Sequence, residues 1–396
     1  MRKLYSLIFI LFLSPAVLNA QYANSWINFN GSQPYSAQQY FKIKVWKKGI
    51  YRLDYSTLQQ AGFNVTQNPH NFQIFHNGTE QYIYIAGETD NTFDPTDYIE
   101  FYGKPNDGWA DKPLYENPSD QLNPDYSLFS DTAVYFLTAA VLPGTPVKRM
   151  ILENDVNFSA YTPLDYITKV SRKNYTGEYL KGDSQGDIDP SYSGPEGFSG
   201  TPFSVNTPSE TFDTPNLSTA VNAPPPVMDV RMVNANYDGY FHTFNVAING
   251  NQVFTDNNIF GYTRYDFNFT LSLTALAANN TLQFSGTANG GGSNRMSVTY
   301  YNLRYAHANT FSGESTPFQF FSVSGSGSKL RVDLNDYLNS DNTPRYIYLL
   351  AGDTVSKITT ARTGNLLQAL IPFGGTESSC LLAAESASYR DRKSVV

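Results

Sequence analysis

The chain has 396 residues, of which only 16% are charged while 15% are aromatic, with 29 Tyr and 27 Phe. A chain this rich in aromatic residues can bury enough surface to offset its conformational entropy, which excludes an intrinsically disordered protein. The net charge of −8 argues against nucleic acid as a partner, because such binding relies on Lys and Arg that neutralise phosphates.

The first twenty residues have the pattern of a secretory signal peptide. Two basic residues follow the initiating methionine, an apolar run extends from Leu4 to Leu13, and Ala20 is a small residue at the expected cleavage site. The apolar run is too short for a membrane span, which needs about 20 residues. We therefore expect residues 1–20 to be removed and the mature chain to be exported without spanning a membrane.

Residues 21–181 form the first expected domain, in which apolar and polar residues alternate with the period of a strand. This alternation predicts strands at 40–45 and 50–53, which Lys48-Gly49 would join as a β-hairpin. Asn77-Gly78 is typical of a tight hairpin turn, since both residues accept positive φ angles. Further strands are expected at 72–75, 82–85, 98–102 and 134–137.

Residues 182–226 are rich in Gly, Pro, Ser and Thr and contain no Lys or Arg, which predicts a long connection between two domains. Asp183, Asp187 and Asp189 form the only tight carboxylate cluster, and such oxygens can bind calcium. Their spacing does not match an EF-hand loop. A solvated acidic loop is the favoured interpretation, and calcium binding stays open.

Residues 227–355 form the second expected domain, again with short alternating strands separated by Gly, Asn and Ser turns. The clearest single strand is Tyr265–Leu273, and Asn249-Gly250 marks another hairpin turn. Other strands are expected at 227–233, 241–248, 281–284, 296–301, 318–323 and 346–350. The sequence therefore predicts a mainly β fold with two β-sandwich-like domains.

Converging catalytic or metal-binding groups are not evident in the sequence. The four histidines, His70, His76, His242 and His307, do not fall in a metal-ligand spacing, and a structural or surface role is favoured for each. Cys380 is the only cysteine. A nucleophile and base made of Cys380 and His307 is conceivable, but a buried, unreactive thiol is the preferred interpretation. We therefore expect no catalytic, cofactor-binding or metal-binding residue in this chain.

Six motifs follow one another in the first part of the chain: Gly49–Leu53, Ala61-Gly62-Phe63, Phe72–Gly78, Phe93–Lys104, Asn106–Trp109 and Tyr126–Leu137. In this order and spacing they resemble the N-terminal region of gingipain-type cysteine peptidases, specifically the PorU-like sortases of the type IX secretion system of Bacteroidota. The resemblance is good over roughly 40–140 and loose over roughly 170–350. From the residues themselves, Trp109 is expected to plug the edge of the sandwich with its indole.

The resemblance implies that a gingipain-type α/β catalytic domain follows the β region. Residues 356–396 are similar to the opening of that domain, with a helix expected at Leu381–Tyr389 and a strand at Ser394–Val396. No position matches the catalytic motifs of the family. The chain thus resembles the non-catalytic front of such an enzyme, truncated before its catalytic His and Cys, and is expected to be inactive alone.

In the intact protein, the resemblance implies a cysteine-type sortase that cleaves C-terminal sorting signals from secreted substrates and passes the acyl group to a surface glycolipid. The expected partners are its own catalytic domain, secreted protein substrates and components of the type IX secretion system. The expected location is the outer-membrane surface or the extracellular space. In this chain, the β region would serve as a scaffold or recognise substrate or partner.

An alternative from another class is a secreted β-sandwich adhesin or carbohydrate-binding module. The aromatic surplus favours it, because Tyr and Trp rings stack on sugars. The same surplus follows from strand propensity and sandwich cores, so composition alone does not separate the two hypotheses.

Overall fold

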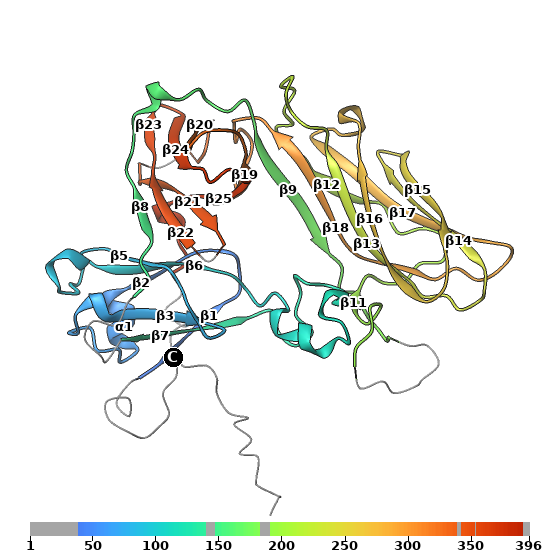
Figure 1. Ribbon diagram of the computed structural model, residues 1–396, viewed down its shortest axis with the longest axis horizontal. Helices are drawn as coiled ribbons and strands as arrows, with labels where there is room; N and C mark the ends of the chain where they lie inside the picture. The colour runs from blue at the N-terminus through green and yellow to red at the C-terminus, as the bar shows by residue number, and fades with distance from the viewer. Residues whose placement is uncertain (1–38, 140–146, 183–190, 339–341, 353, 391–396) are drawn as a thin grey trace, which may run out of the picture.

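The computed structural model describes residues 39–139, 147–182, 191–338, 342–352 and 354–390. The described chain is mainly β, as predicted, and its buried side chains form three large cores. We call the corresponding parts the first unit (residues 39–139), the sandwich unit (mostly 167–307) and the third unit (mostly 311–390). Figure 1 shows the first unit in blue below the third unit in red, with the sandwich unit to one side.

The first unit contains two small antiparallel sheets, with strand orders β1-β7-β3-β4 and β2-β6-β5. A short helix, α1 (Tyr55–Gln60), follows β2. The strands are β1 (Phe41–Val45), β2 (Gly49–Asp54), β3 (Phe72–His76), β4 (Thr79–Glu80), β5 (Ile83–Ile85), β6 (Tyr98–Gly103) and β7 (Ala133–Ala139). Apolar residues from both sheets share one core, with Ile43, Leu58 and Phe101 fully buried.

The turn predictions for the first unit have different outcomes. Asn77-Gly78 forms the predicted tight turn between β3 and β4, with φ angles of 47° and 77°. The hairpin predicted at Lys48-Gly49 is wrong, since β1 pairs with β7 and β2 pairs with β6. Gly49 instead serves close packing: a Cβ there would lie 2.7 Å from the ring of Tyr389 and 2.9 Å from that of Phe318.

The sandwich unit packs a four-stranded sheet, β12-β17-β14-β15, against part of a nine-stranded sheet, β16-β13-β18-β9. Its core is rich in Met, Phe and Tyr side chains. Asn249-Gly250 forms the predicted turn between β14 and β15. The strands are β9 (Ile167–Asn174), β12 (Glu210–Asp213), β13 (Val227–Asn234), β14 (Phe241–Ile248), β15 (Asn251–Ile259), β16 (Thr263–Thr270), β17 (Asn279–Asn289) and β18 (Met296–His307).

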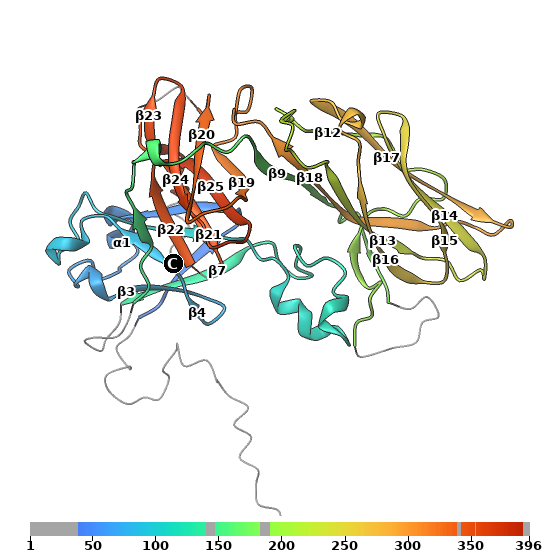
Figure 2. The same cartoon turned by 45° about the horizontal axis from the view of Figure 1, so that its top comes forward.

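The third unit continues the nine-stranded sheet as β19-β25-β21-β22-β8 and packs it against a smaller sheet, β20-β24-β23. Figure 2 shows these strands beside the first unit. They are β8 (Ile151–Glu153), β19 (Phe318–Val323), β20 (Lys329–Asn335), β21 (Arg345–Ala351), β22 (Thr354–Thr359), β23 (Ala361–Thr363), β24 (Leu366–Pro372) and β25 (Ser378–Ala384).

The helix predicted at Leu381–Tyr389 is wrong. That stretch begins within β25, which pairs with β19 and β21 near the middle of the sheet, and ends in a short 3₁₀ turn at Glu385–Ala387. Both faces of β25 are buried, with Cys380 and Leu382 in the core of the third unit. A strand buried on both faces has a continuous apolar run, which cannot be told from a helix by period alone.

The expected domain boundaries divide elements that the structure keeps together. The boundary after 355 falls inside β22, and β9 lies in the sandwich sheet although it was assigned to the domain at 21–181. The described part of 182–226 is ordered by pairing: β11 (Gly197–Ser199) pairs with β10 (Glu178–Leu180), and β12 pairs with β17.

Some sequence predictions lie outside the described residues. They are the signal peptide at 1–20, the acidic cluster Asp183, Asp187 and Asp189, and the strand at Ser394–Val396. Within the described ranges, no helix has the length and apolar character that a membrane crossing requires.

Candidate binding cleft

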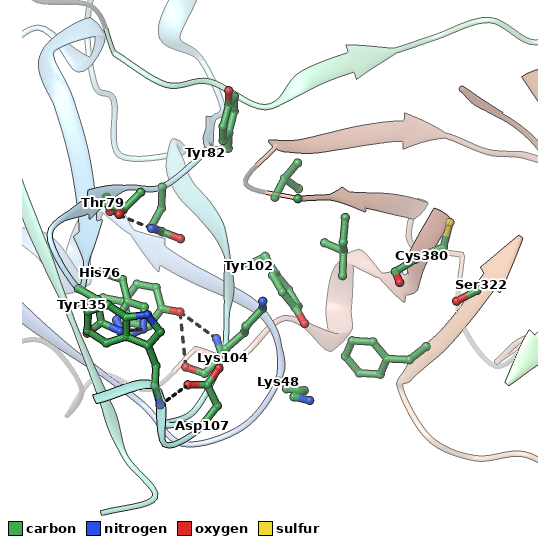
Figure 3. A pocket seen from close by; sticks show the side chains of 18 of the residues that line it. Lys48, His76, Thr79, Tyr82, Tyr102, Lys104, Asp107, Tyr135, Ser322 and Cys380 are labelled. Carbon is green, nitrogen blue, oxygen red and sulfur yellow. Dashed lines mark hydrogen bonds between the residues drawn. The ribbon is translucent and has the colours of Figure 1, made fainter. Parts of the chain in front are cut away.

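The three units surround a cleft of about 730 Å³. Its walls come from the β3–β4 turn and the segment after β6 in the first unit, from β9 in the sandwich unit, and from β19 and β25 in the third unit. Figure 3 shows His76 and Tyr102 on one side and Ser322 and Cys380 on the other. The volume lies in the usual range of ligand-binding sites.

Each unit contributes an exposed apolar side chain to this cleft. Trp109 is 54% exposed, Val170 is 53% exposed and Phe320 is 36% exposed, and all three line the cavity. Trp109 therefore does not plug a sandwich edge, as the sequence had suggested. Gly108, at a φ of 73°, begins the 3₁₀ turn Trp109–Leu114, which holds the indole at the surface. Apolar groups that converge on one cavity mark a binding surface more strongly than scattered ones.

The charged residues of the cleft are unevenly paired. The carboxylates have backbone partners: Glu80 accepts from the N–H of Lys148 at 2.8 Å, and Asp107 accepts from the N–H of Trp109 at 3.1 Å. Lys48 and Lys104 line the same cavity and form no ion pair with any described residue. The cleft thus offers two unpaired ammonium groups in a protein whose net charge is −8.

His76 lies in the wall of the cleft. Its ring stacks on Tyr135 with centroids 4.1 Å apart, and its Nδ1 lies 3.2 Å from the carbonyl oxygen of Val134. Burial lowers the pKa of His76, against the opposing effect of that carbonyl, so the neutral ring is favoured. A neutral imidazole stacked on a tyrosine is a structural element of the wall.

Cys380 lies in the wall of the cleft but is 1% exposed and belongs to the core of the third unit. Its Sγ lies 3.9 Å from the carbonyl oxygen of Ser378, and burial raises the pKa of the thiol far above its ordinary value. A thiol that stays protonated is a poor nucleophile. His307 is occupied elsewhere, with its ring nitrogens 2.6 Å from the oxygen of Ala308 and 2.7 Å from Glu314.

The two remaining histidines differ in burial. His242 is fully buried and lies 3.1 Å from both Asp238 and Asn294, whereas His70 is exposed near Glu88. Over the described part of the chain, no group of three or more His, Cys, Asp or Glu side chains is arranged to hold a metal ion.

A buried ionic cluster joins the first and third units beside the cleft. Glu100 on β6 is 1% exposed and contacts Arg52 on β2 at 2.6 Å and Lys357 on β22 at 2.8 Å. The ammonium of Lys357 also lies over the rings of Tyr84 and Tyr346, at 3.8 and 4.2 Å. Burial lowers the pKa of Lys357, and Glu100 opposes that shift.

The sequence analysis did not identify this cluster. The available signal was a charged residue inside each of two largely apolar strands, Arg52 in GIYRLD and Glu100 in YIEFYG. Charges at positions that face a core are seldom buried unless they are paired. That signal does not reveal the third member, Lys357, which comes from a distant strand.

No protein-family model matches this sequence, and no curated protein matches it either. Among solved structures, the chain is similar to dimeric latent PorU from Porphyromonas gingivalis, with a TM-score of 0.55 and 16% sequence identity. The match covers 89% of this chain and 32% of that chain, so the sequence spans about a third of the PorU structure.

Two other solved structures align at TM-scores too low to support an argument. They are the insecticidal delta-endotoxin Cry8Ea1 from Bacillus thuringiensis, at 0.21 and 11% identity, and BuGH86 in complex with neoagarooctaose, at 0.20 and 12% identity. The first alignment covers 44% of this chain and 27% of that one, and the second covers 68% and 33%. The fold of this chain is thus similar to that of part of PorU, a resemblance of architecture at low sequence identity.

Proposed function

We propose that this chain is the non-catalytic N-terminal β region of a PorU-related protein of the gingipain type. The observation that carries the proposal is the fold match at a TM-score of 0.55 over 89% of the chain. The match spans all three units, which include elements far apart in sequence, and a chance sharing of one sandwich would not extend so far. The motifs between Gly49 and Leu137 support the same family.

In this proposal the β region is a scaffold, and the chemistry belongs to a catalytic domain beyond it. The region holds a cleft where three units meet, and it docks the catalytic domain, a secreted substrate or a component of the secretion system there. The intact protein acts at the outer-membrane surface or outside the cell, on C-terminal sorting signals of secreted proteins. The enclosed thiol of Cys380 is consistent with a chain that has no nucleophile of its own.

The test compares residues 1–396 with the longest reading frame that contains them. Each protein is incubated with a secreted protein that carries a C-terminal sorting signal, and cleavage is followed by mass spectrometry. We expect cleavage by the longer protein only, and loss of that cleavage when a Cys in its additional domain is replaced. Cleavage by residues 1–396 alone, or a longer frame without an α/β domain containing His and Cys, would contradict the proposal.

One observation favours a second function, the binding of a saccharide. Trp109 is 54% exposed and lines the same cleft as Tyr82 and Tyr102, and flat aromatic faces stack on sugar rings. A glycan array with the purified chain tests this function. Tight binding of one saccharide that Trp109→Ala abolishes would favour a carbohydrate-binding module over the scaffold.

A further inference from the structure

Strands β9 and β19 meet at one point and separate along the rest of their length. One bridge joins them, between Thr168 and Ser322. Continued in antiparallel register, the next pair would be Val170 with Phe320, but these residues do not pair. Figures 1 and 2 show β9 leaving the third unit toward β18 of the sandwich unit.

The facing edges of the two strands are open beyond this bridge. On its other side β9 pairs with β18 over its whole length, and β19 pairs in the same way with β25. No further strand of the described chain pairs with either facing edge. An unpaired edge presents a row of backbone N–H and C=O groups, which is a template for another strand. Here both edges border the cleft, since Val170 and Phe320 line it.

The surroundings of these edges define what can bind. Val170, Phe320 and Trp109 supply apolar contacts, and Lys48 and Lys104 supply positive charge without a carboxylate partner among the described residues. A cavity of about 730 Å³ holds one extended segment but not the edge of a whole sheet. With Arg172, the lining holds three cationic side chains against the two carboxylates Glu80 and Asp107. The charge and the size together favour a single acidic, extended segment over a second copy of this chain.

We propose that the wedge between β9 and β19 binds an extended segment of a separate polypeptide by strand addition, with apolar side chains against Val170 and Phe320 and carboxylates near Lys48 and Lys104. Main-chain hydrogen bonds give such complexes their affinity, and alternate side chains give them specificity. This inference goes beyond the proposed function, because it concerns the described residues alone and does not depend on a catalytic domain.

The test uses fluorescein-labelled peptides and the purified chain, with binding followed by fluorescence anisotropy. A peptide of alternating Val and Glu is expected to bind about tenfold more tightly than one of alternating Val and Lys. Two further Val–Glu peptides are N-methylated, one on every Val and the other on every Glu. A strand in the wedge turns one set of N–H groups toward β9 and the other toward β19. At least one methylated peptide should therefore bind about tenfold or more weakly than the unmethylated peptide.

Matched variants locate the site. Val170→Glu is expected to weaken binding of the Val–Glu peptide by about tenfold or more, whereas Val156→Glu, at a similarly exposed valine outside the cleft, should leave it unchanged. Lys104→Glu and Lys112→Glu form a second matched pair of variants. Only Lys104 lines the cleft, so only Lys104→Glu should weaken binding of the Val–Glu peptide. If Val170→Glu does not fold, Phe320→Ala replaces it.

Disulfide trapping gives an independent measurement. Cys380 is 1% exposed, so Val170→Cys introduces the accessible thiol, which should capture a Val–Glu peptide carrying one activated cysteine. Binding of both methylated peptides as tight as that of the unmethylated peptide, or equal binding by Val170→Glu and Val156→Glu, would overturn the proposal. Self-association of the chain that Val170→Glu abolishes would assign the wedge to a second copy and also overturn it.

Discussion

The carboxylate of Glu314 contacts three polar side chains, those of His307, Asn216 and Lys169. It lies 2.7 Å from Nε2 of the fully buried His307 and 2.9 Å from the side chain of Asn216, and it pairs with Lys169. These groups come from separate segments, so the carboxylate joins β9, the end of β18 and the segment that follows β12 in one cluster. Desolvation raises the pKa of Glu314, but the hydrogen bonds outweigh it and lower the pKa from 4.5 to about 2.

This shift predicts how acid affects stability. A depressed pKa means that the contribution of Glu314 is complete above about 4.5 and disappears as the pH falls toward about 2. Glu314→Gln leaves Lys169 and His307 without their carboxylate, and it should lower the free energy of unfolding by about 3 kcal/mol near neutral pH. The gap between wild type and variant should narrow progressively between these two pH values, as measured by urea unfolding.

The control for Glu314 is another ion pair of the same kind at the surface. Glu377 pairs with Arg304, and both side chains are more than a third exposed. Glu377→Gln should change the free energy of unfolding by less than about 1 kcal/mol, because exposed pairs contribute little. A similar decrease in the free energy of unfolding for both variants would show that the hydrogen bonds around Glu314 stabilise the fold no more than an exposed ion pair does.

At the scale of the strands and turns, the local features could be predicted from the sequence, whereas the long-range pairing of the strands could not. Asn77-Gly78 and Asn249-Gly250 adopt the positive φ angles that a two-residue hairpin turn requires, and those turns are confirmed. The pairing of β9 with β18 could not be predicted, because alternation marks a strand without naming its neighbour. β25 was not recognised as a strand for a different reason, since a strand buried on both faces shows no alternation of apolar and polar residues.

The candidate site was less predictable than the fold. A structural or surface role was expected for His76, and its place in the cleft wall depends on Tyr135, a residue of β7. The cleft itself is assembled from three units. The sequence marked Trp109 only as a plug for the sandwich edge, and no local pattern marks Val170 or Phe320. A site built by tertiary packing leaves no motif, so neither spacing nor composition could indicate it.

Gly49 gives a prediction at the same scale, because it is where β2 passes under the third unit. A methyl group there would lie 2.7 Å from Tyr389 and 2.9 Å from Phe318, which are ring atoms at the joint between units. Gly49→Ala should therefore lower the free energy of unfolding by about 1–3 kcal/mol, as overpacking does. Gly374→Ala meets nothing within 4 Å and serves as the control in the same thermal unfolding experiment. Equal melting temperatures for Gly49→Ala and Gly374→Ala would mean that the rings at the joint move aside freely to accommodate the added methyl group.

The whole molecule depends on how the first and third units are held together, since the cleft lies between them and the sandwich unit. Apolar residues at this joint include Ile50, Tyr348 and Leu381, and the ionic cluster of Glu100, Arg52 and Lys357 is buried among them. A buried ion pair adds little net stability when complete, but the loss of one partner leaves an uncompensated charge.

Glu100 contacts both cations of that cluster. Glu100→Gln would leave Arg52 with Glu385, 2.9 Å away, and would leave Lys357 without a carboxylate partner among the described residues. We expect the free energy of unfolding to fall by about 3–5 kcal/mol, with the effect concentrated at the joint between the first and third units. Calorimetry should then resolve separate transitions, and limited proteolysis should cut between the first and third units. Glu178→Gln, which affects an exposed pair with Arg295, should retain the wild-type profile. If Glu100→Gln unfolds in the same single step as the wild type, the apolar contacts alone hold the joint, and the cleft keeps its shape without the ionic cluster.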